Sequence, residues 1–107
     1  MTDEQPDLII RAGRVSCADT GLDGPGAVAV RGDRIVASGP NVSGPAKQTL
    51  DFPDGTLLPG LVDLHAHPGS ETWRFAVDAD TNMLARGSTT VLSQGDAGSA
   101  TWTYYRD

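Results

Sequence analysis

The spacing of the apolar residues changes near residue 56. Before that point the apolar residues form short runs separated by Gly and Pro, at 7–11, 14–16, 27–31, 34–38 and 49–52. Short runs rich in Val and Ile predict β-strands. Two of them flank Gly32-Asp33, a two-residue turn that predicts a β-hairpin. We therefore expect residues 7 to about 56 to form antiparallel strands in a β-sandwich-like layer, with a loop at 20–26 and a turn at 53–55.

The segment after residue 56 has longer apolar runs. Residues 56–64 predict a strand buried on both faces, as in a parallel sheet. Residues 73–86 carry apolar side chains at helical spacing, with Asp78 as a candidate N-cap and Gly87 as a C-terminal stop. Residues 89–93 predict a second strand, and residues 100–106 can begin another helix. The order strand, helix, strand predicts a βαβ unit with parallel strands.

These patterns divide the chain into a small N-terminal β-domain segment, 1–56, and a first βαβ unit, 57–107. A parallel sheet of two strands leaves its faces and edges uncovered. We therefore expect the chain to be truncated, with more strands to follow.

Composition narrows the class of partner. The 107 residues include 8 Lys and Arg against 14 Asp and Glu, for a net charge of −6. Nucleic acid and anionic membranes both require a basic face, so neither is an expected partner. No apolar run reaches the roughly 18 residues of a membrane span, and the acidic start does not resemble a signal peptide. A single cysteine, Cys17, cannot form an internal disulfide, which favours a reducing, cytoplasmic location.

The candidate chemistry lies at the end of the 56–64 run. His65 and His67 are separated by one residue, and alternate residues of a strand point to the same face. Two imidazoles placed in this way can bind one divalent ion such as zinc. Asp63 falls on the same face and could orient a ligand histidine. An isolated His-x-His pair also arises by chance, so its context decides.

Two motifs supply that context. Residues 58–67, Leu-Pro-Gly-Leu-Val-Asp-Leu-His-Ala-His, resemble the "PG-hydrophobic-hydrophobic-D-x-H-x-H" signature of the amidohydrolase superfamily. Residues 87–91, Gly-Ser-Thr-Thr-Val, resemble the "G-x-T-T-V" that opens the second barrel strand in the same proteins. Residues 7–15 and 30–39 resemble the small β-domain that precedes the barrel.

The resemblance implies an α/β fold, the start of a (β/α)8 TIM barrel preceded by a small β-domain. It implies one or two divalent metal ions, commonly zinc, with His65 and His67 as ligands of the more buried ion. It also implies a metal-bound hydroxide that hydrolyses a non-peptide C–N bond of a small cyclic-amide or N-acyl substrate. The remaining ligands and the catalytic Asp are expected beyond residue 107, so these residues alone should be inactive.

The loop after the second strand bears on the subfamily. Residues 93–98 resemble the "DAGS"-type loop of the deacetylase and dihydroorotase-like branch. In another register, Asp96 takes the position at which some D-aminoacylase-like members carry a metal-ligating Cys. Asp96 is therefore a candidate to bind the metal, to contact a metal ligand or to contact the substrate. The alternative is that it is a plain turn residue.

Several residues are weaker candidates. Trp73, Trp102, Tyr104 and Tyr105 could line a substrate pocket or serve only in packing, Glu71 could touch substrate, and Cys17 is more typical of a packed residue than of a nucleophile.

Other functions stay open from the sequence. The chain could be a noncatalytic β-domain interaction module with a vestigial barrel start. It could also be a complete metal-binding protein with two histidines, although these would fill only half of a tetrahedral zinc site. Assembly into a homo-oligomer is compatible with either.

Overall fold

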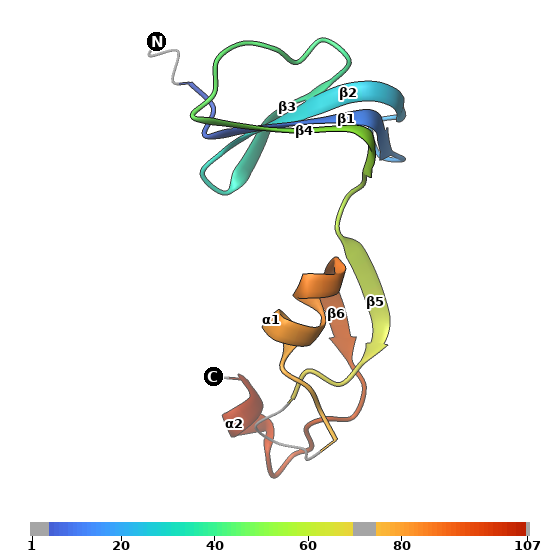
Figure 1. Cartoon of the computed structure of the whole chain (residues 1–107). Helices are drawn as coiled ribbons and strands as arrows, with labels where there is room; N and C mark the ends of the chain where they lie inside the picture. Colours follow the sequence, from blue (N-terminus) through green and yellow to red (C-terminus); the bar gives the residue numbers. More distant parts are fainter. Residues whose placement is uncertain (1–4, 70–74, 107) are drawn as a thin grey trace. The chain divides into compact units, whose positions relative to one another are not determined.

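The computed structural model describes residues 5–69 and 75–106. The chain divides into two compact units, Met1–Pro59 and Gly60–Asp107. Figure 1 labels the elements of each unit.

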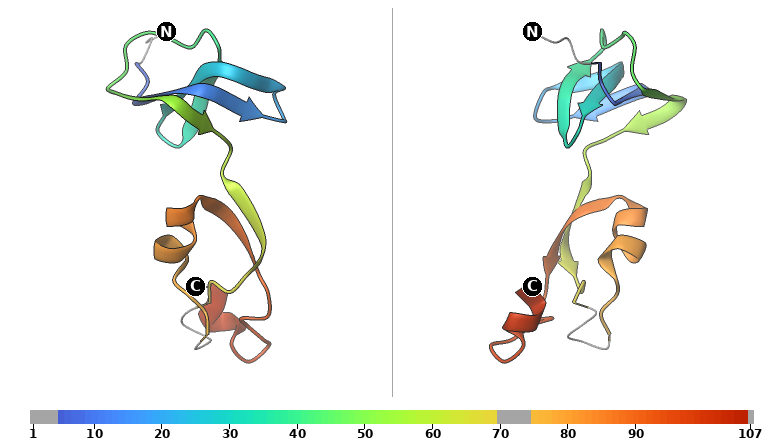
Figure 2. Two further views of the ribbon diagram at one scale, coloured as in Figure 1. Left: turned by 45° about the vertical axis from the view of Figure 1, so that its right-hand side comes forward. Right: turned by 90° about the vertical axis from the view of Figure 1, so that its left-hand side faces the viewer.

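The first unit is a four-stranded sheet. Its strands are β1 (Leu8–Cys17), β2 (Leu22–Arg31), β3 (Arg34–Gly39) and β4 (Gln48–Leu57), arranged in the order β3-β2-β1-β4 (Figures 1 and 2). The predicted hairpin is confirmed: Arg31 pairs with Arg34 across the turn, and Gly32 has a φ of 56°. Glycine tolerates this left-handed conformation at no steric cost.

The expectation of an all-antiparallel, sandwich-like layer is wrong. The four strands form one mixed sheet, in which β2 runs antiparallel to β1 and β3 but β4 runs parallel to β1. The cause is the connection after β3, which carries the chain to the far edge of the sheet. There Lys47 N–H donates to the Pro6 carbonyl and Gln48 N–H to the Asp7 carbonyl, so β4 begins beside the start of β1.

The Gly- and Pro-rich segments 20–26 and 53–55 were expected to be a loop and a turn, yet most of their residues lie within strands. β2 begins at Leu22, and β4 continues through Pro53. Pro25 falls beyond the last residue of β2 that pairs with β3, so no neighbour on that side needs its missing N–H. Pro53 lies on the edge strand β4, where its pairing with β1 shifts register. Edges and bulges are the positions at which a sheet accepts proline.

The runs 7–11 and 14–16 also form one strand, β1, interrupted by an irregularity between Ala12 and Val15. One face of the sheet holds a small core of Ile9, Ala27 and Ala29, and Val42 and Ala46 from the β3–β4 connection pack against it. The connection thus covers the core and also carries the chain to the edge at which β4 runs parallel to β1.

The second unit contains the predicted parallel pair. β5 (Leu61–Ala66) pairs in parallel with β6 (Ser88–Ser93), and α1 (Ala79–Asn82) and the 3-10 turn η1 (Leu84–Arg86) lie between them in sequence. The parallel strands and the intervening helical segment are confirmed. The short helix α2 (Trp102–Arg106) follows, also as expected.

The helix is shorter than the predicted 73–86. The Asp78 carboxylate caps α1 by accepting a hydrogen bond from Thr81 N–H, and Gly87, with a φ of 94°, ends η1. Between these stops the sequence Ala-Asp-Thr-Asn favours caps and turns over helix interiors, which accounts for the single turn of α1. Residues 73 and 74 lie outside the described part of the chain.

The run 56–64 is not one buried strand. Leu57 ends β4, and β5 begins only at Leu61, after Pro59 and Gly60. Within this unit β5 is also more exposed than predicted, since Val62 and Leu64 keep 61% and 68% of their surface. The reason is that, among the described residues, β5 and β6 form a two-stranded sheet.

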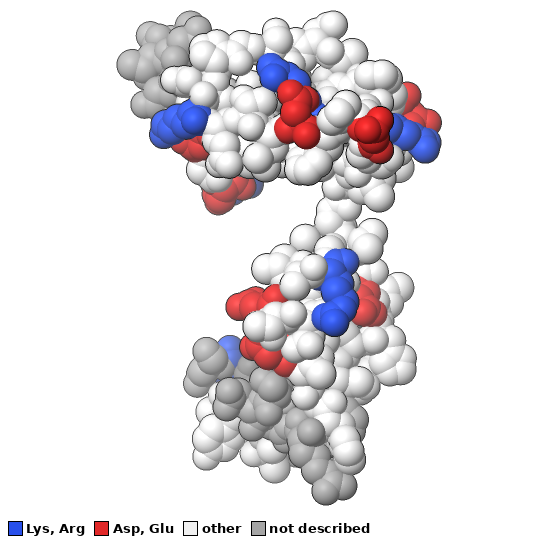
Figure 3. Space-filling view, viewed as in Figure 1, with Lys and Arg blue, Asp and Glu red and all other residues white. Residues whose placement is uncertain are grey.

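Charges are mixed over the face of the molecule shown in Figure 3. On the first unit, Lys and Arg side chains lie next to Asp and Glu, and this view shows no broad basic patch. Among the described residues, no helix has the length and hydropathy needed to cross a bilayer.

Candidate metal centre

The two histidines lie together at the carboxyl end of β5. His65 is the penultimate residue of the strand, and His67 is the first residue after it. Their ring centroids are 5.5 Å apart, and the ring planes cross at 67°. The rings are thus neighbours on one side of the chain, as the alternation of a strand predicts.

The carboxylate of Asp96 holds one of these rings. His67 Nδ1 lies 2.6 Å from Asp96 Oδ1. The other oxygen, Oδ2, accepts hydrogen bonds from Gly69 N–H at 3.0 Å and from the Ser93 hydroxyl at 2.9 Å. The Asp96 side chain has no solvent-exposed surface, whereas that of His67 is 33% exposed. A buried carboxylate thus joins the segment after β5 to the segment after β6.

These contacts determine the charge of Asp96. Burial raises the pKa of its carboxyl, but the hydrogen bonds from His67, Gly69 and Ser93 together outweigh burial, and the net pKa lies below its usual value. An ionised carboxylate is only an acceptor, so His67 Nδ1 is the donor in the 2.6 Å contact. In the neutral ring with its proton on Nδ1, the lone pair lies on Nε2, which is the nitrogen that would bind a metal ion.

Asp63 has a different contact. Its Oδ1 accepts a hydrogen bond from the backbone N–H of His65 at 3.0 Å. This contact holds the backbone at His65 and does not involve an imidazole ring. The idea that Asp63 orients a ligand imidazole therefore stays a prediction. The carboxylate of Asp96, by contrast, is bonded to the ring of His67.

Gln94 was not singled out from the sequence. Its backbone N–H donates to the Ala66 carbonyl, and its side-chain amide donates to the Leu64 carbonyl, both at 3.0 Å. His67 is held from another side by Val77 N–H, which donates to its carbonyl at 2.9 Å. The carboxyl ends of parallel strands lie at the same edge of a sheet. The position of Gln94 just after β6 could therefore have predicted that it lies near the end of β5.

The weaker candidates do not join this cluster in the part of the chain that the structure describes. Trp102 and Tyr104 are 54% and 79% exposed. Glu71, Trp73 and the side chain of Tyr105 lie outside the described residues, and Cys17 ends β1 in the first unit. Within the described ranges, no group of three or more His, Cys, Asp or Glu residues could hold a metal ion. The histidine pair, with Asp96 bonded to one of its rings, is thus a candidate for part of a metal centre only.

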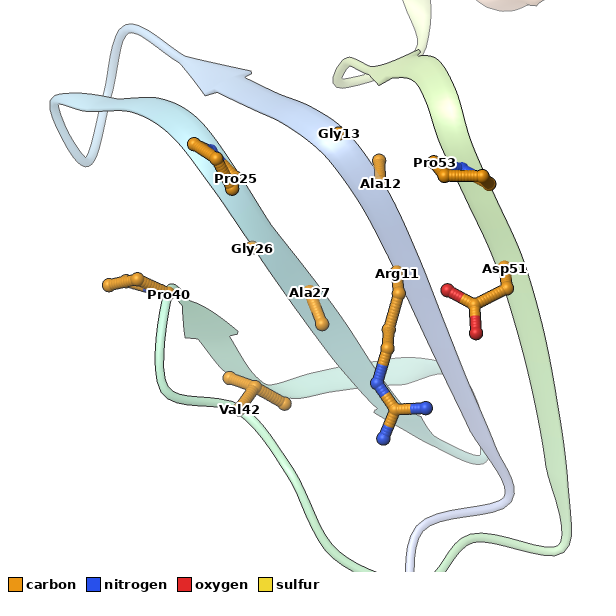
Figure 4. A pocket seen from close by; sticks show the side chains of 10 residues that line it. All are labelled: Arg11, Ala12, Gly13, Pro25, Gly26, Ala27, Pro40, Val42, Asp51 and Pro53. Carbon is orange, nitrogen blue, oxygen red and sulfur yellow. The ribbon is translucent and has the colours of Figure 1, made fainter.

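A hollow of about 610 Å³ lies on the sheet of the first unit (Figure 4). Pro25, Pro40, Val42 and Pro53 line much of it, and Arg11 and Asp51 contribute charge from paired positions of β1 and β4. Its lining includes neither His nor Cys. Its donor set is therefore poorer for metal chemistry than the histidine pair, although it is larger than the hollow beside α1 and β6.

Comparison with known proteins places these features in a family. No protein-family model matches the chain. The allantoinase of Rubrobacter xylanophilus is 37% identical over 95 residues, covering 79% of this chain and 18% of the relative. A dihydroorotase of Streptococcus thermophilus is 34% identical over 88 residues, covering 79% of this chain and 21% of the relative. The chain thus spans about a fifth of the length of these relatives.

Solved structures give the same grouping. An adenine deaminase has a TM-score of 0.75 and 26% identity, with 96% of this chain and 27% of that chain covered. The N-acyl-D-glutamate deacylase of Bordetella bronchiseptica, solved with zinc and a phosphonate inhibitor, has a TM-score of 0.65 and 26% identity, with 84% of this chain and 19% of that chain covered. The chain belongs to the amidohydrolase superfamily.

Proposed function

We propose that this chain is the part of a metal-dependent hydrolase that supplies two metal ligands, His65 and His67. The reaction is hydrolysis of a non-peptide C–N bond in a small cyclic-amide or N-acyl substrate. One observation carries the proposal: two adjacent imidazoles lie at the carboxyl end of β5, and one of them is bonded through Nδ1 to a buried carboxylate.

The donor set fits a divalent ion of the zinc type. Neutral imidazole is a common zinc ligand, and a metal-binding histidine usually donates its other ring N–H to a carboxylate or carbonyl. His67 has this arrangement with Asp96. His65 and His67 provide two of the four positions of a tetrahedral site, so the proposal requires further ligands from a longer polypeptide. The modest share of the relatives' length that this chain covers is in keeping with that requirement.

The family supports the metal and the bond type. The Bordetella deacylase contains zinc, and an adenosine deaminase from Xanthomonas campestris with a TM-score of 0.66 also has bound zinc. We further propose that β5, the α1–η1 segment and β6 form the first βαβ unit of a (β/α)8 barrel. Active sites of such barrels lie at the carboxyl ends of the strands, which is the end of β5 that carries His65.

In this proposal, each part of the centre has a role. His65 and His67 bind the ion, while Gln94 and Val77 hold the backbone from which the rings project. A bound divalent ion would supply Lewis acidity, which polarises the substrate carbonyl and favours attack by water near neutral pH. The loops after β5 and β6 would then face the substrate, as they do in barrels generally.

The test uses the protein encoded by the complete reading frame. Dihydroorotate, allantoin and a set of N-acyl amino acids are offered as substrates to the zinc-loaded protein, to the chelated protein, and to His65→Ala and His67→Ala. We expect hydrolysis of at least one class, its loss on chelation and its return with zinc, and no activity in either variant. Asp80→Ala, which removes an exposed acid of α1, should retain activity. Hydrolysis that survives chelation or both histidine substitutions would overturn the proposal, and so would a zinc-loaded protein that hydrolyses none of these substrates.

A further inference from the structure

We propose that Asp96 is a positioning residue of the centre: it fixes the His67 ring as an Nε2 ligand and does not itself bind the ion. This inference rests on the proposed function and deepens it, because the sequence alone left metal ligation by Asp96 open.

The first argument is the occupancy of the carboxylate. Oδ1 is engaged by His67 Nδ1 at 2.6 Å, and Oδ2 accepts from both Gly69 N–H and the Ser93 hydroxyl. A carboxylate offers about four lone-pair sites, and these three donors already use most of them. Ligation would have to use the one remaining site or displace one of these bonds, and no solvent could replace a displaced bond because the side chain is fully buried.

The second argument is the separation of the bonded segments. Asp96 and Ser93 come from the segment at and after β6, while His67 and Gly69 come from the segment after β5. The carboxylate therefore holds the ring against the neighbouring strand as well as setting its protonation. Such outer carboxylates orient imidazole ligands and raise their basicity.

The isosteric variant Asp96→Asn separates the two roles. An amide can present only one oxygen. If that oxygen faces His67, the amide NH2 faces two donors, Gly69 N–H and the Ser93 hydroxyl. If the amide is reversed, its NH2 faces Nδ1 and favours the tautomer with the proton on Nε2, and that nitrogen then cannot bind a metal. Either orientation weakens the centre without changing the volume of the side chain.

The experiment reads the tautomer directly. The complete protein is labelled with 15N-histidine and freed of metal, and the imidazoles of His65 and His67 are examined by long-range 1H–15N correlation at alkaline pH. We expect His67 to carry its proton on Nδ1 in the wild type and to shift toward the Nε2–H form in Asp96→Asn. His65, whose backbone alone is held by Asp63, should keep its own pattern. A wild-type His67 protonated on Nε2 would overturn the inference, whether or not the variant folds.

Zinc binding provides the second readout. Loss of an outer carboxylate typically lowers metal affinity about 10- to 100-fold while the ligands stay the same. We expect this loss in Asp96→Asn, with the same number of imidazoles and oxygens around zinc by X-ray absorption as in the wild type. Ser93→Ala, which removes one donor but leaves the carboxylate, should keep the His67 tautomer and lose less affinity. Unchanged affinity in Asp96→Asn would refute the inference, and so would the loss of one oxygen ligand from the zinc.

The histidine variants separate this inference from the proposed function. If His65→Ala and His67→Ala bind zinc as the wild type does, the proposed function fails. If they lose zinc but Asp96→Asn changes neither the tautomer nor the affinity, only the positioning role of Asp96 fails.

Discussion

The substitution Gly60→Ala should destabilise the second unit through a specific steric conflict. A Cβ at residue 60 would lie 1.9 Å from Thr89 Oγ1, 2.4 Å from its Cγ2 and 2.6 Å from its Cβ. Rotation of the Thr89 side chain between staggered rotamers can move the first two atoms away. The Thr89 Cβ moves only with the backbone of β6. The start of β5 must therefore move away from β6 by about 0.4 Å to restore even a 3.0 Å contact. This movement would strain the hydrogen bond from Leu61 N–H to the Gly87 carbonyl, which joins the two segments at this point.

The expected loss is about 1–3 kcal/mol, the usual cost of overpacking where atoms cannot relax freely. Urea unfolding followed by tryptophan fluorescence measures it, because both tryptophans of the chain, residues 73 and 102, belong to the second unit. Gly98→Ala is the matched control, since a Cβ there meets no atom within 4 Å and no positive φ is imposed. It should change stability by no more than about 0.5 kcal/mol.

A double-mutant cycle isolates the contact. Thr89→Gly removes every atom that would clash, at a cost of up to about 1 kcal/mol in strand preference. In the Gly60→Ala/Thr89→Gly variant the loss should be smaller than the sum of the two single losses by about 1–3 kcal/mol. Additive losses would refute the steric explanation and leave the glycine of the Pro-Gly motif unexplained by packing.

Two further predictions concern local stability. Ile9→Ala removes three carbons from a side chain that is 1% exposed and should cost about 2–5 kcal/mol, seen as faster amide exchange across β1 and β2. Ile35→Ala, at a position that is 68% exposed, should leave exchange nearly unchanged, and equal effects would contradict the assigned core. Asp78→Ala should fray α1 in amide exchange, whereas Asp78→Asn, which can still cap, should do so less. Hydrogen bonds from the Thr81 hydroxyl and backbone N–H lower the pKa of Asp78. The stabilisation that the Asp78 cap provides is thus complete above the ordinary pKa of an aspartate, about 3.9. It is lost as the pH falls through the lower pKa of the folded state. Amide protection of α1 that is unchanged in acid would contradict this role of Asp78.

Local signals predicted the local parts of the fold. The Gly32 turn, the Asp78 cap and the Gly87 stop each depend on residues close together in sequence, and the structure has all three. The parallel placement of β4 could not be found in this way, because it depends on where a connection carries the chain across the sheet. Strands that run through Pro25 and Pro53 were missed for a related reason: only the pairing partners reveal that these prolines lie beyond a neighbour or at an edge.

The candidate centre shows the same division. The His65–His67 pair follows from the two-residue repeat of a strand, and its context comes from a motif within ten residues. From the sequence, Asp63 was a candidate to orient a ligand histidine, and Asp96 was a candidate for metal or substrate contact or a plain turn residue. Only the folded chain separates them, by placing Asp96 against the His67 ring across 29 residues and Asp63 against a backbone N–H.

The most direct test of the central claim is the zinc stoichiometry of the complete protein, measured by elemental analysis after dialysis against trace zinc. The wild type should retain at least one zinc per chain. His65→Ala and His67→Ala should each retain markedly less, because each substitution removes one ligand from the ion. Wild-type zinc content in both variants would contradict the assignment of the histidine pair as metal ligands.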